Sequence, residues 1–228
     1  HLSLRRQRQM CIRDRLKEDP DVIIDMVDAT NIERNLYLTT QLIETGVPVV
    51  IALNMADLLE KRGIQIDVSR LSERMGCPVV ETSALKGEGL EKLIDTAVKT
   101  AEKRGDVHPE PIFSEELEKA VAAVENMLAS SVEEGKRRWY AVKILENDSK
   151  VIESMSLSVS LRATADDLRK GLEAKHDDDI ESIVTDERYQ FIQKVSAAAV
   201  KKGKEKMTVS DKICLLYTSD AADEGLGV

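Results

Sequence analysis

Three short apolar stretches, each followed by an amphipathic one, most constrain what this chain can fold into. Each apolar stretch is rich in β-branched residues, which predicts a strand. They are residues 21–27 (DVIIDMV), 49–53 (VVIAL) and 78–81 (PVVE). The stretches that follow carry apolar residues at helical spacing, at residues 31–45, 67–75 and 89–103. Strands that alternate with helices through short loops predict right-handed βαβ units and a parallel sheet, with a ligand at the carboxyl ends of the strands.

The pattern changes after Gly105. Residues 106–111 (DVHPEP) hold two prolines and are typical of a linker. Beyond them we find no convincing strand, and four helices are predicted, at residues 114–130, 138–145, 161–175 and 180–202. Residues 138–145 are ambiguous between helix and strand, and helix is favoured by the spacing of their apolar residues. The expected fold class is therefore α/β, a parallel sheet of three strands followed by a small all-helical domain.

Composition excludes several classes of protein. The chain has 228 residues, 33% of them charged, and a net charge of -9, which argues against a general nucleic-acid binder. No apolar run approaches the roughly 20 residues of a membrane-spanning helix. The three cysteines have no metal-ligand spacing, and they indicate a reducing compartment.

The two ends of the chain have neither helical nor strand periodicity. Residues 5–14 (RRQRQMCIRD) and 214–223 (CLLYTSDAAD) can be back-translated into DNA strings that are reverse complements of one another, apart from a one-base offset. They resemble a sequencing-library adapter read through from both sides. We therefore expect residues 1–15 and 213–228 to be adapter-derived.

One candidate site begins where the second predicted strand ends. Asn54, Met55 and Asp57 follow its apolar run in the pattern Asn-x-x-Asp. Guanine presents two donors, at N1 and N2, and a carboxylate such as that of Asp57 can accept both protons. Adenine has no such pair of donors. The alternative is that Asn54 and Asp57 cap the helix that follows an ordinary strand.

The third predicted strand ends in Thr-Ser-Ala-Leu-Lys-Gly. Its Ser83, Ala84 and Leu85 form the second loop that a base-binding site needs. A Ser-Ala turn can present backbone N–H groups to the guanine carbonyl, and its small side chains let the base approach. The order of the two loops predicts guanine binding more specifically than either loop alone.

The two loops and the sequence around them resemble a known family of proteins. The first half resembles the later part of a Ras-like GTPase domain, and residues 21–57 (DVIIDMVDATNIERNLYLTTQLIETGVPVVIALNMAD) are similar to the ferrous iron transport protein B family. By this resemblance, residues 16–104 are the C-terminal part of a GTPase domain, 105–112 a linker, and 113–212 a helical regulatory domain.

The resemblance implies a parent protein that binds GTP or GDP, with Mg²⁺ held by residues missing here, and whose permease domain would be the partner of this region. It implies that the parent lies at the cytoplasmic face of the inner membrane and that this fragment is soluble. It implies no nucleic-acid partner, and it leaves open whether the protein forms a homo-oligomer. The chain has no G-x-x-x-x-G-K-[ST] loop. We therefore assign no catalytic residue and no metal ligand, and expect a GTPase parent and an inactive fragment.

Several features of the sequence allow other interpretations. Another Ras-like GTPase, of the ribosome- or RNA-associated kind, and a non-enzymatic helical interaction module are the alternative functions. Residues 176–179 (HDDD) could bind a divalent ion through one imidazole and three carboxylates, but acidic residues directly before a helix also interact favourably with its N-terminus, and we prefer this second interpretation. Residues 201–206 (KKGKEK) suit either an anionic lipid surface or a solvated helix end.

Overall fold

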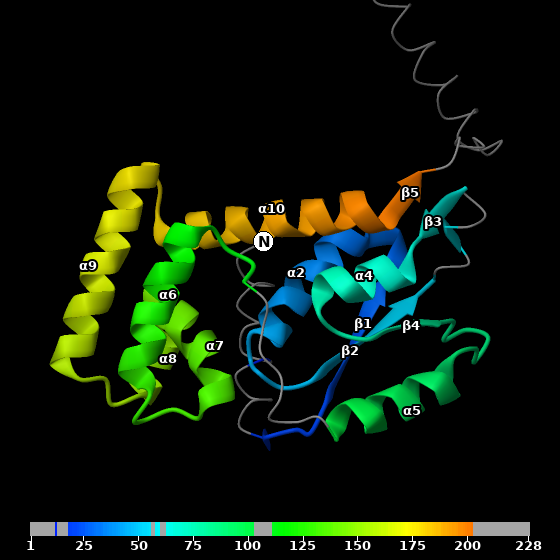
Figure 1. Cartoon of the computed structure of the whole chain (residues 1–228), viewed down its shortest axis with the longest axis horizontal. Helices are drawn as coiled ribbons and strands as arrows, with labels where there is room; N and C mark the ends of the chain where they lie inside the picture. The colour runs from blue at the N-terminus through cyan, green and yellow to red at the C-terminus, as the bar shows by residue number, and fades with distance from the viewer. Residues whose placement is uncertain (1–11, 13–17, 56–57, 60–62, 103–110, 203–228) are drawn as a thin grey trace, which may run out of the picture.

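The computed structural model of the chain describes residue 12 and residues 18–55, 58–59, 63–102 and 111–202. Three parallel strands form the main sheet in the order β1-β2-β4 (Figure 1). They are β1 (Ile23–Asp28), β2 (Val49–Asn54) and β4 (Val79–Thr82). In their register, Asp28 lies beside Asn54 and Asn54 beside Thr82, so all three strands end at one edge. The parallel sheet predicted from the sequence is confirmed.

Helices cover both faces of this sheet. On one face, α2 (Ile32–Ile43) and α4 (Val68–Met75) pack over the odd-numbered residues of β2. A short 3-10 turn, η1 (Ala29–Asn31), leads into α2. On the other face, α5 (Leu90–Ala101) packs over the even-numbered residues. Because side chains alternate along a strand, β2 is buried on both faces, which explains its unbroken apolar sequence.

β1 lies at an edge of the sheet, and one of its faces is bare. Ile24 and Met26 are 45% and 54% exposed, although their neighbours in β2 are buried under α5. The helix at residues 89–103 was expected to bury Leu90, Leu93, Ile94 and Val98, but of these only Leu93 is buried, and Ala97 is buried beside it. The expectation was wrong for the other residues, because among the described elements α5 packs chiefly over β2 and β4, and Ile94 and Val98 lie outside that contact.

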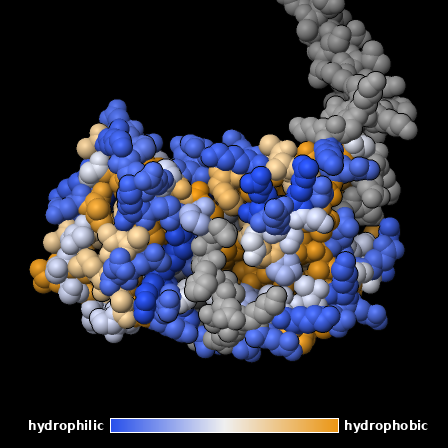
Figure 2. Space-filling model, viewed as in Figure 1, coloured by the Kyte–Doolittle hydropathy of each residue, from blue (hydrophilic) through white to orange (hydrophobic). Residues whose placement is uncertain are grey.

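The second half is helical, as predicted. Its elements are α6 (Glu115–Leu128), α7 (Glu134–Leu145), α8 (Ser149–Ser154), α9 (Val159–His176) and α10 (Ile180–Ala199). The ambiguous stretch at residues 138–145 is helix, and α7 begins four residues earlier. Figure 2 shows mostly hydrophilic residues on the surface of the viewed face. Within the described ranges, no helix combines the length and apolar character needed to cross a bilayer.

A second sheet was missed by the sequence analysis. β3 (Ile64–Ile66) pairs antiparallel with β5 (Val200–Lys202), which continues directly from α10. The helix expected at residues 180–202 is corrected at its end: α10 ends at Ala199 and three residues of strand follow. The reason is that β3, more than 130 residues earlier in the chain, offers backbone hydrogen bonds to β5 that a sequence window cannot reveal.

Two apolar cores share the helices that connect them. The larger core lies on the face of β2 that α2 and α4 cover, and it includes Trp139 of α7 and Ile192 of α10. The core of the helical half includes Ile144 of α7 and Val184 of α10. Ile12, which lies in the stretch that the sequence assigns to adapter, is buried in the larger core. Because α7 and α10 each belong to both cores, the two halves of the chain are packed together.

Candidate nucleotide-base site

The loops that end β2 and β4 are tied together by a side chain. The Ala84 N–H donates to Oδ1 of Asn54 over 3.1 Å. Asn54 ends β2 next to Thr82, the last residue of β4, so the amide can reach the first turn of the neighbouring loop. The structure thus brings together Asn54, Ser83 and Ala84, three residues predicted for the site, at the carboxyl edge of the sheet.

The loop after β4 folds back on itself. Ser83 and Glu88 exchange two backbone hydrogen bonds of 3.0 and 3.2 Å, and the Lys86 N–H donates to the Ser83 carbonyl. Gly89 closes the loop at φ +78°, where a Cβ would lie 2.2 Å from the Glu81 carbonyl oxygen, so only glycine fits. Leu85 lies at the tip of this loop, where its side chain is 97% exposed.

The loop after β2 is described only in part. Met55 is exposed and has a positive φ of 65°, a conformation that few non-glycine residues adopt and that turns the chain sharply away from the strand. Its carbonyl accepts from the Leu58 N–H over 3.1 Å. Asp57, the predicted guanine acceptor, lies outside the described residues together with Ala56.

A third polar turn lies at the same edge, and the sequence analysis assigned it no role in the site. Asp28 ends β1 and accepts from the N–H and hydroxyl of Thr30, at 2.8 and 2.7 Å, and from the Asn31 side chain at 3.0 Å. These hydrogen bonds, chiefly those from Asn31 and then Thr30, lower the pKa of Asp28. The Asp-x-Thr-Asn pattern directly after a strand is the signal that could have identified this cap.

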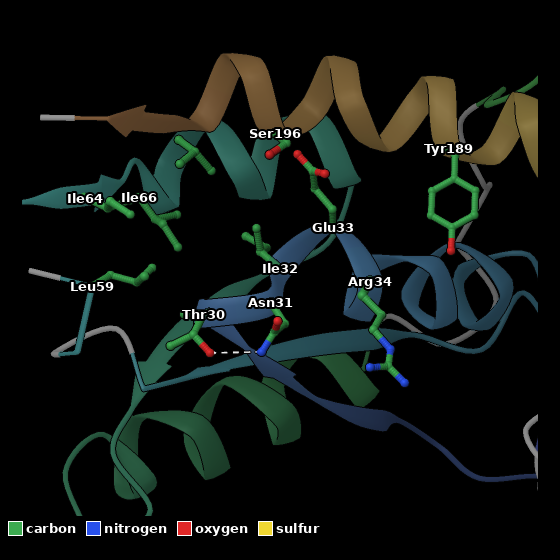
Figure 3. Close-up of a pocket in the computed structure, with 12 residues that line it drawn as sticks. Thr30, Asn31, Ile32, Glu33, Arg34, Leu59, Ile64, Ile66, Tyr189 and Ser196 are labelled. Atoms are coloured by element: carbon green, nitrogen blue, oxygen red, sulfur yellow. Dashed lines mark hydrogen bonds between the residues drawn. The ribbon is translucent and has the colours of Figure 1, made fainter. Parts of the chain in front are cut away.

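A cavity of about 460 Å³ lies between the start of α2, the β3–β5 ribbon and α10 (Figure 3). Thr30 and Asn31 form its polar wall, and Ile66 and Val200 are among its apolar lining. Leu59, which follows the loop after β2, also lines it. The cavity therefore lies where the edge of the sheet meets the end of the helical half.

The structure agrees with the prediction that the acidic residues within 176–179 lie at the start of a helix. Asp179 caps α10, because its carboxylate accepts from the Ser182 N–H over 2.8 Å. The His176 ring nitrogen Nε2 lies 3.7 Å from a carboxylate oxygen of Glu116, which Lys175 also contacts at 2.6 Å. Among the residues that the structure describes, no cluster of three His, Cys, Asp or Glu side chains could hold a metal ion.

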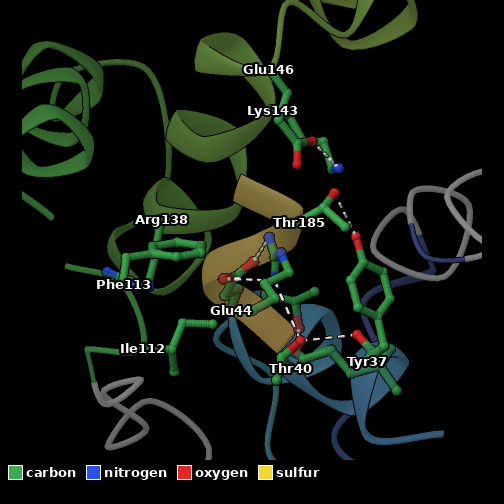
Figure 4. A network of polar contacts seen from close by, with 12 residues as sticks. Tyr37, Thr40, Glu44, Ile112, Phe113, Arg138, Lys143, Glu146 and Thr185 are labelled. Atoms are coloured by element: carbon green, nitrogen blue, oxygen red, sulfur yellow. Dashed lines mark hydrogen bonds and ion pairs between the residues drawn. The ribbon is translucent and has the colours of Figure 1, made fainter. Parts of the chain in front are cut away.

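A buried ion pair joins α10 to α2 across the two halves (Figure 4). The guanidinium of Arg188 donates to both carboxylate oxygens of Glu44, at 2.9 and 2.8 Å, and the two side chains are 0% and 2% exposed. Phe113, the first buried residue after the linker, lies against Arg188 with the guanidinium carbon 5.2 Å from its ring centre. Arg138 lies against the same ring at 5.5 Å and pairs with Glu118.

Two family descriptions match this sequence. "Ferrous iron transport protein B" covers residues 3–97, and "FeoB cytosolic helical domain" covers residues 113–201. The chain belongs to the ferrous iron transport protein B family. This membership sets aside the ribosome- or RNA-associated GTPase that the sequence analysis left open.

Solved structures of the family agree with the fold. A GDP-bound mutant of the S. thermophilus FeoB G-domain is 43% identical, with a TM-score of 0.79, over 84% of this chain and 74% of that one. NFeoB from S. thermophilus with bound mGMPPNP is 42% identical, with a TM-score of 0.75, over 84% of this chain and 71% of that one. These identities support family membership as well as a shared fold.

The curated relatives are much longer than this chain. The Fe(2+) transporter FeoB of Escherichia coli K12 is 39% identical over 135 residues, which are 58% of this chain and 17% of the transporter. A Porphyromonas gingivalis Fe(2+) transport protein A/Fe(2+) transporter FeoB fusion protein is 35% identical over 229 residues, covering 92% of this chain and 26% of the fusion. This FeoB-family chain therefore spans only about a sixth to a quarter of these relatives.

Proposed function

We propose that this chain binds the base of guanine nucleotides within the cytosolic region of a ferrous iron transporter. The observation that carries the proposal is the hydrogen bond from Ala84 to Asn54, which joins the two predicted base loops at the carboxyl edge of a parallel sheet. Relatives solved with GDP and mGMPPNP bound support the choice of ligand. In a doubly wound sheet, ligands bind at this edge.

The role of each residue follows from its chemistry. The carboxylate of Asp57 accepts from N1–H and from the amino group of guanine. Asn54 holds the loop after β4 in place, and Met55 fixes the turn between them. The N–H groups of Ser83 and Ala84 hold the loop by donating to Glu88 and Asn54, which leaves the Leu85 N–H to donate to the guanine carbonyl. In the intact protein, Mg²⁺ and the phosphates are bound by residues that this sequence does not contain, and the nucleotide state acts on a permease domain at the cytoplasmic face of the inner membrane.

Base choice tests the proposal. Asp57→Asn turns one acceptor oxygen into a donor that faces the guanine amino group, at a cost of roughly 1–3 kcal/mol. Xanthine carries a carbonyl where guanine carries that amine. The variant should therefore bind GDP more weakly and xanthosine diphosphate more tightly than the wild type does. Asn54→Ala should weaken the binding of both nucleotides, because the Ala84 N–H loses its acceptor. Ligand-observed NMR titration of both nucleotides at millimolar concentration measures this, and equal GDP binding by Asp57→Asn and the wild type would refute it.

A further inference from the structure

The cavity at the start of α2 has the size and the lining of a small-molecule site. Its volume of about 460 Å³ falls within the roughly 300–1,000 Å³ of ligand pockets in proteins. One wall is apolar and belongs to the larger core or packs against it, and it consists of Leu59, Ile64, Ile66 and Val200 (Figure 3). An aliphatic ligand placed against this wall would lose its contact with water, which favours binding.

Ser196 of α10 presents an unused hydroxyl to this cavity. The residue lines the cavity and is 7% exposed, and its Oγ has no hydrogen-bond partner within the part of the chain that the structure describes. Thr30 and Asn31, which also line the cavity, already donate to Asp28. A polar group that is left unpaired at such burial costs free energy. A ligand that forms a hydrogen bond with Ser196 would therefore be favoured.

Glu33 places a negative charge at the same end of the cavity. Figure 3 shows its side chain extending from α2 toward α10, where Ser196 lies. Among the described residues, no cation pairs with this carboxylate, and Arg34, which also lines the cavity, points away from α10 in the same view. An ionised carboxylate only accepts hydrogen bonds, whereas a hydroxyl accepts or donates. The two groups together suit a positively charged head group that carries several N–H donors.

We propose that this cavity binds a primary amine with a short aliphatic body. The ammonium group donates to the carboxylate of Glu33 and to Oγ of Ser196, and the carbon chain lies along the apolar wall. An anion of the same length is rejected, because its head group would face the like charge of Glu33. A neutral alcohol keeps the apolar contact and loses the attraction between charges. The site uses neither of the base loops, so it goes beyond the proposed function and does not depend on it.

Probes of one chain length separate charge from apolar contact. Hexylamine, hexan-1-ol and hexanoate are titrated at pH 7 into the isotope-labelled intact chain, and amide chemical shifts report binding. Hexylamine should shift the amides of Ser196 and Ile66 and bind at least about fivefold more tightly than hexan-1-ol, and hexanoate should bind more weakly than both. Butylamine should bind roughly tenfold more weakly than hexylamine, because each of the two lost methylenes contributes about three- to fourfold.

Two variants form a matched pair for the charge. Glu33→Gln and Glu91→Gln each remove an acidic residue from the first turn of a helix, α2 and α5 respectively. Glu33→Gln should weaken hexylamine binding at least about fivefold, and Glu91→Gln should leave it within about twofold of the wild type. Ser196→Ala should weaken hexylamine binding about threefold. Binding of hexan-1-ol should stay within about twofold of the wild type in Glu33→Gln, which checks that the cavity is intact.

Three results would overturn the proposal. The first is equal affinity for hexylamine and hexanoate in the wild-type chain. The second is the same hexylamine affinity in Glu33→Gln and Glu91→Gln. The third is a set of shifts that spreads over the surface instead of gathering on the amides that line the cavity, because that pattern identifies nonspecific association.

Discussion

Breaking the buried pair between Glu44 and Arg188 should destabilise the protein strongly. The perturbation is Glu44→Gln, which keeps the shape of the side chain and removes its charge. Arg188 then remains in a site where it is 0% exposed, and it loses the carboxylate that accepts two of its hydrogen bonds. Burial alone would lower the pKa of Arg188, but the attraction of Glu44 and, to a smaller degree, of Glu146 outweighs burial and leaves the pKa raised, so the guanidinium stays charged.

The magnitude follows from that burial. Removing one partner of a fully buried pair costs about 3–5 kcal/mol, because the other charge is left uncompensated. This is a large share of the roughly 5–15 kcal/mol that stabilises a typical domain. Replacing both partners with apolar residues, in Glu44→Leu with Arg188→Met, removes both desolvation costs. The double variant should therefore lie within about 2 kcal/mol of the wild type.

Urea unfolding followed by circular dichroism measures these free energies, and the four proteins form a double-mutant cycle. Glu115→Gln is the matched control, because its pair with Lys119 is exposed. That variant should change the free energy of unfolding by less than about 1 kcal/mol. A loss under about 1 kcal/mol for Glu44→Gln, or no recovery in the double variant, would refute the reasoning.

Three further outcomes are expected. The bare edge of β1 should make the chain self-associate, and Met26→Lys should lower the apparent mass in light scattering at equal concentration; a monomeric wild type contradicts this. Burial, with a smaller contribution from Asp25, raises the pKa of the Cys77 thiol to about 12, so iodoacetamide at pH 8 should label Cys77 only in denaturant, as peptide mapping will show. Desolvation raises the pKa of Glu125, so this carboxyl favours the fold only while protonated, and that stability is lost as the pH rises through the folded-state pKa. Glu125→Gln should therefore raise the urea midpoint at pH 7 but not at pH 4, and an equal gain at both pH values would be the contrary result.

The main sheet could be predicted from the sequence because its signals are local. A run such as VVIAL can be buried on both faces only as a central strand, and β2 is that strand. The joining of Asn54 to Ala84 follows from this, since parallel strands end at one edge. Base recognition by Asp57 is still a prediction, because that residue lies outside the described ranges.

The buried charges were missed because sequence patterns treat charged residues as exposed. Yet Arg188 interrupts an apolar stripe in α10, between Val184 and Ile192. Glu44 similarly follows Leu36 and Thr40 at a spacing of four along α2. Opposite charges within the buried stripes of two helices are a usable signal of a buried pair. The partner of each stripe is nevertheless set by tertiary packing, and a single sequence does not reveal it.

The linker predicted at residues 105–112 separates two stretches of chain, but the cores do not divide there. The larger core takes four large side chains from beyond the linker, namely Trp139, Val151, Ile192 and Val195. At roughly 1.5–3 kcal/mol each, their burial contributes about 6–12 kcal/mol, which is comparable to the whole stability of a domain. The core of the helical half, in contrast, takes all of its described residues from 112–184.

This asymmetry predicts that the two halves behave differently when they are separated. Residues 18–102 alone should show no cooperative unfolding transition, because most of the apolar cover of α2 and α4 is lost with α7 and α10. Residues 111–202 alone should unfold cooperatively, since their core is complete. Thermal and urea unfolding followed by circular dichroism measure both, and the intact chain should show one transition because α7 and α10 belong to both cores. A cooperative transition in residues 18–102 would mean that the nucleotide half is an independent domain after all.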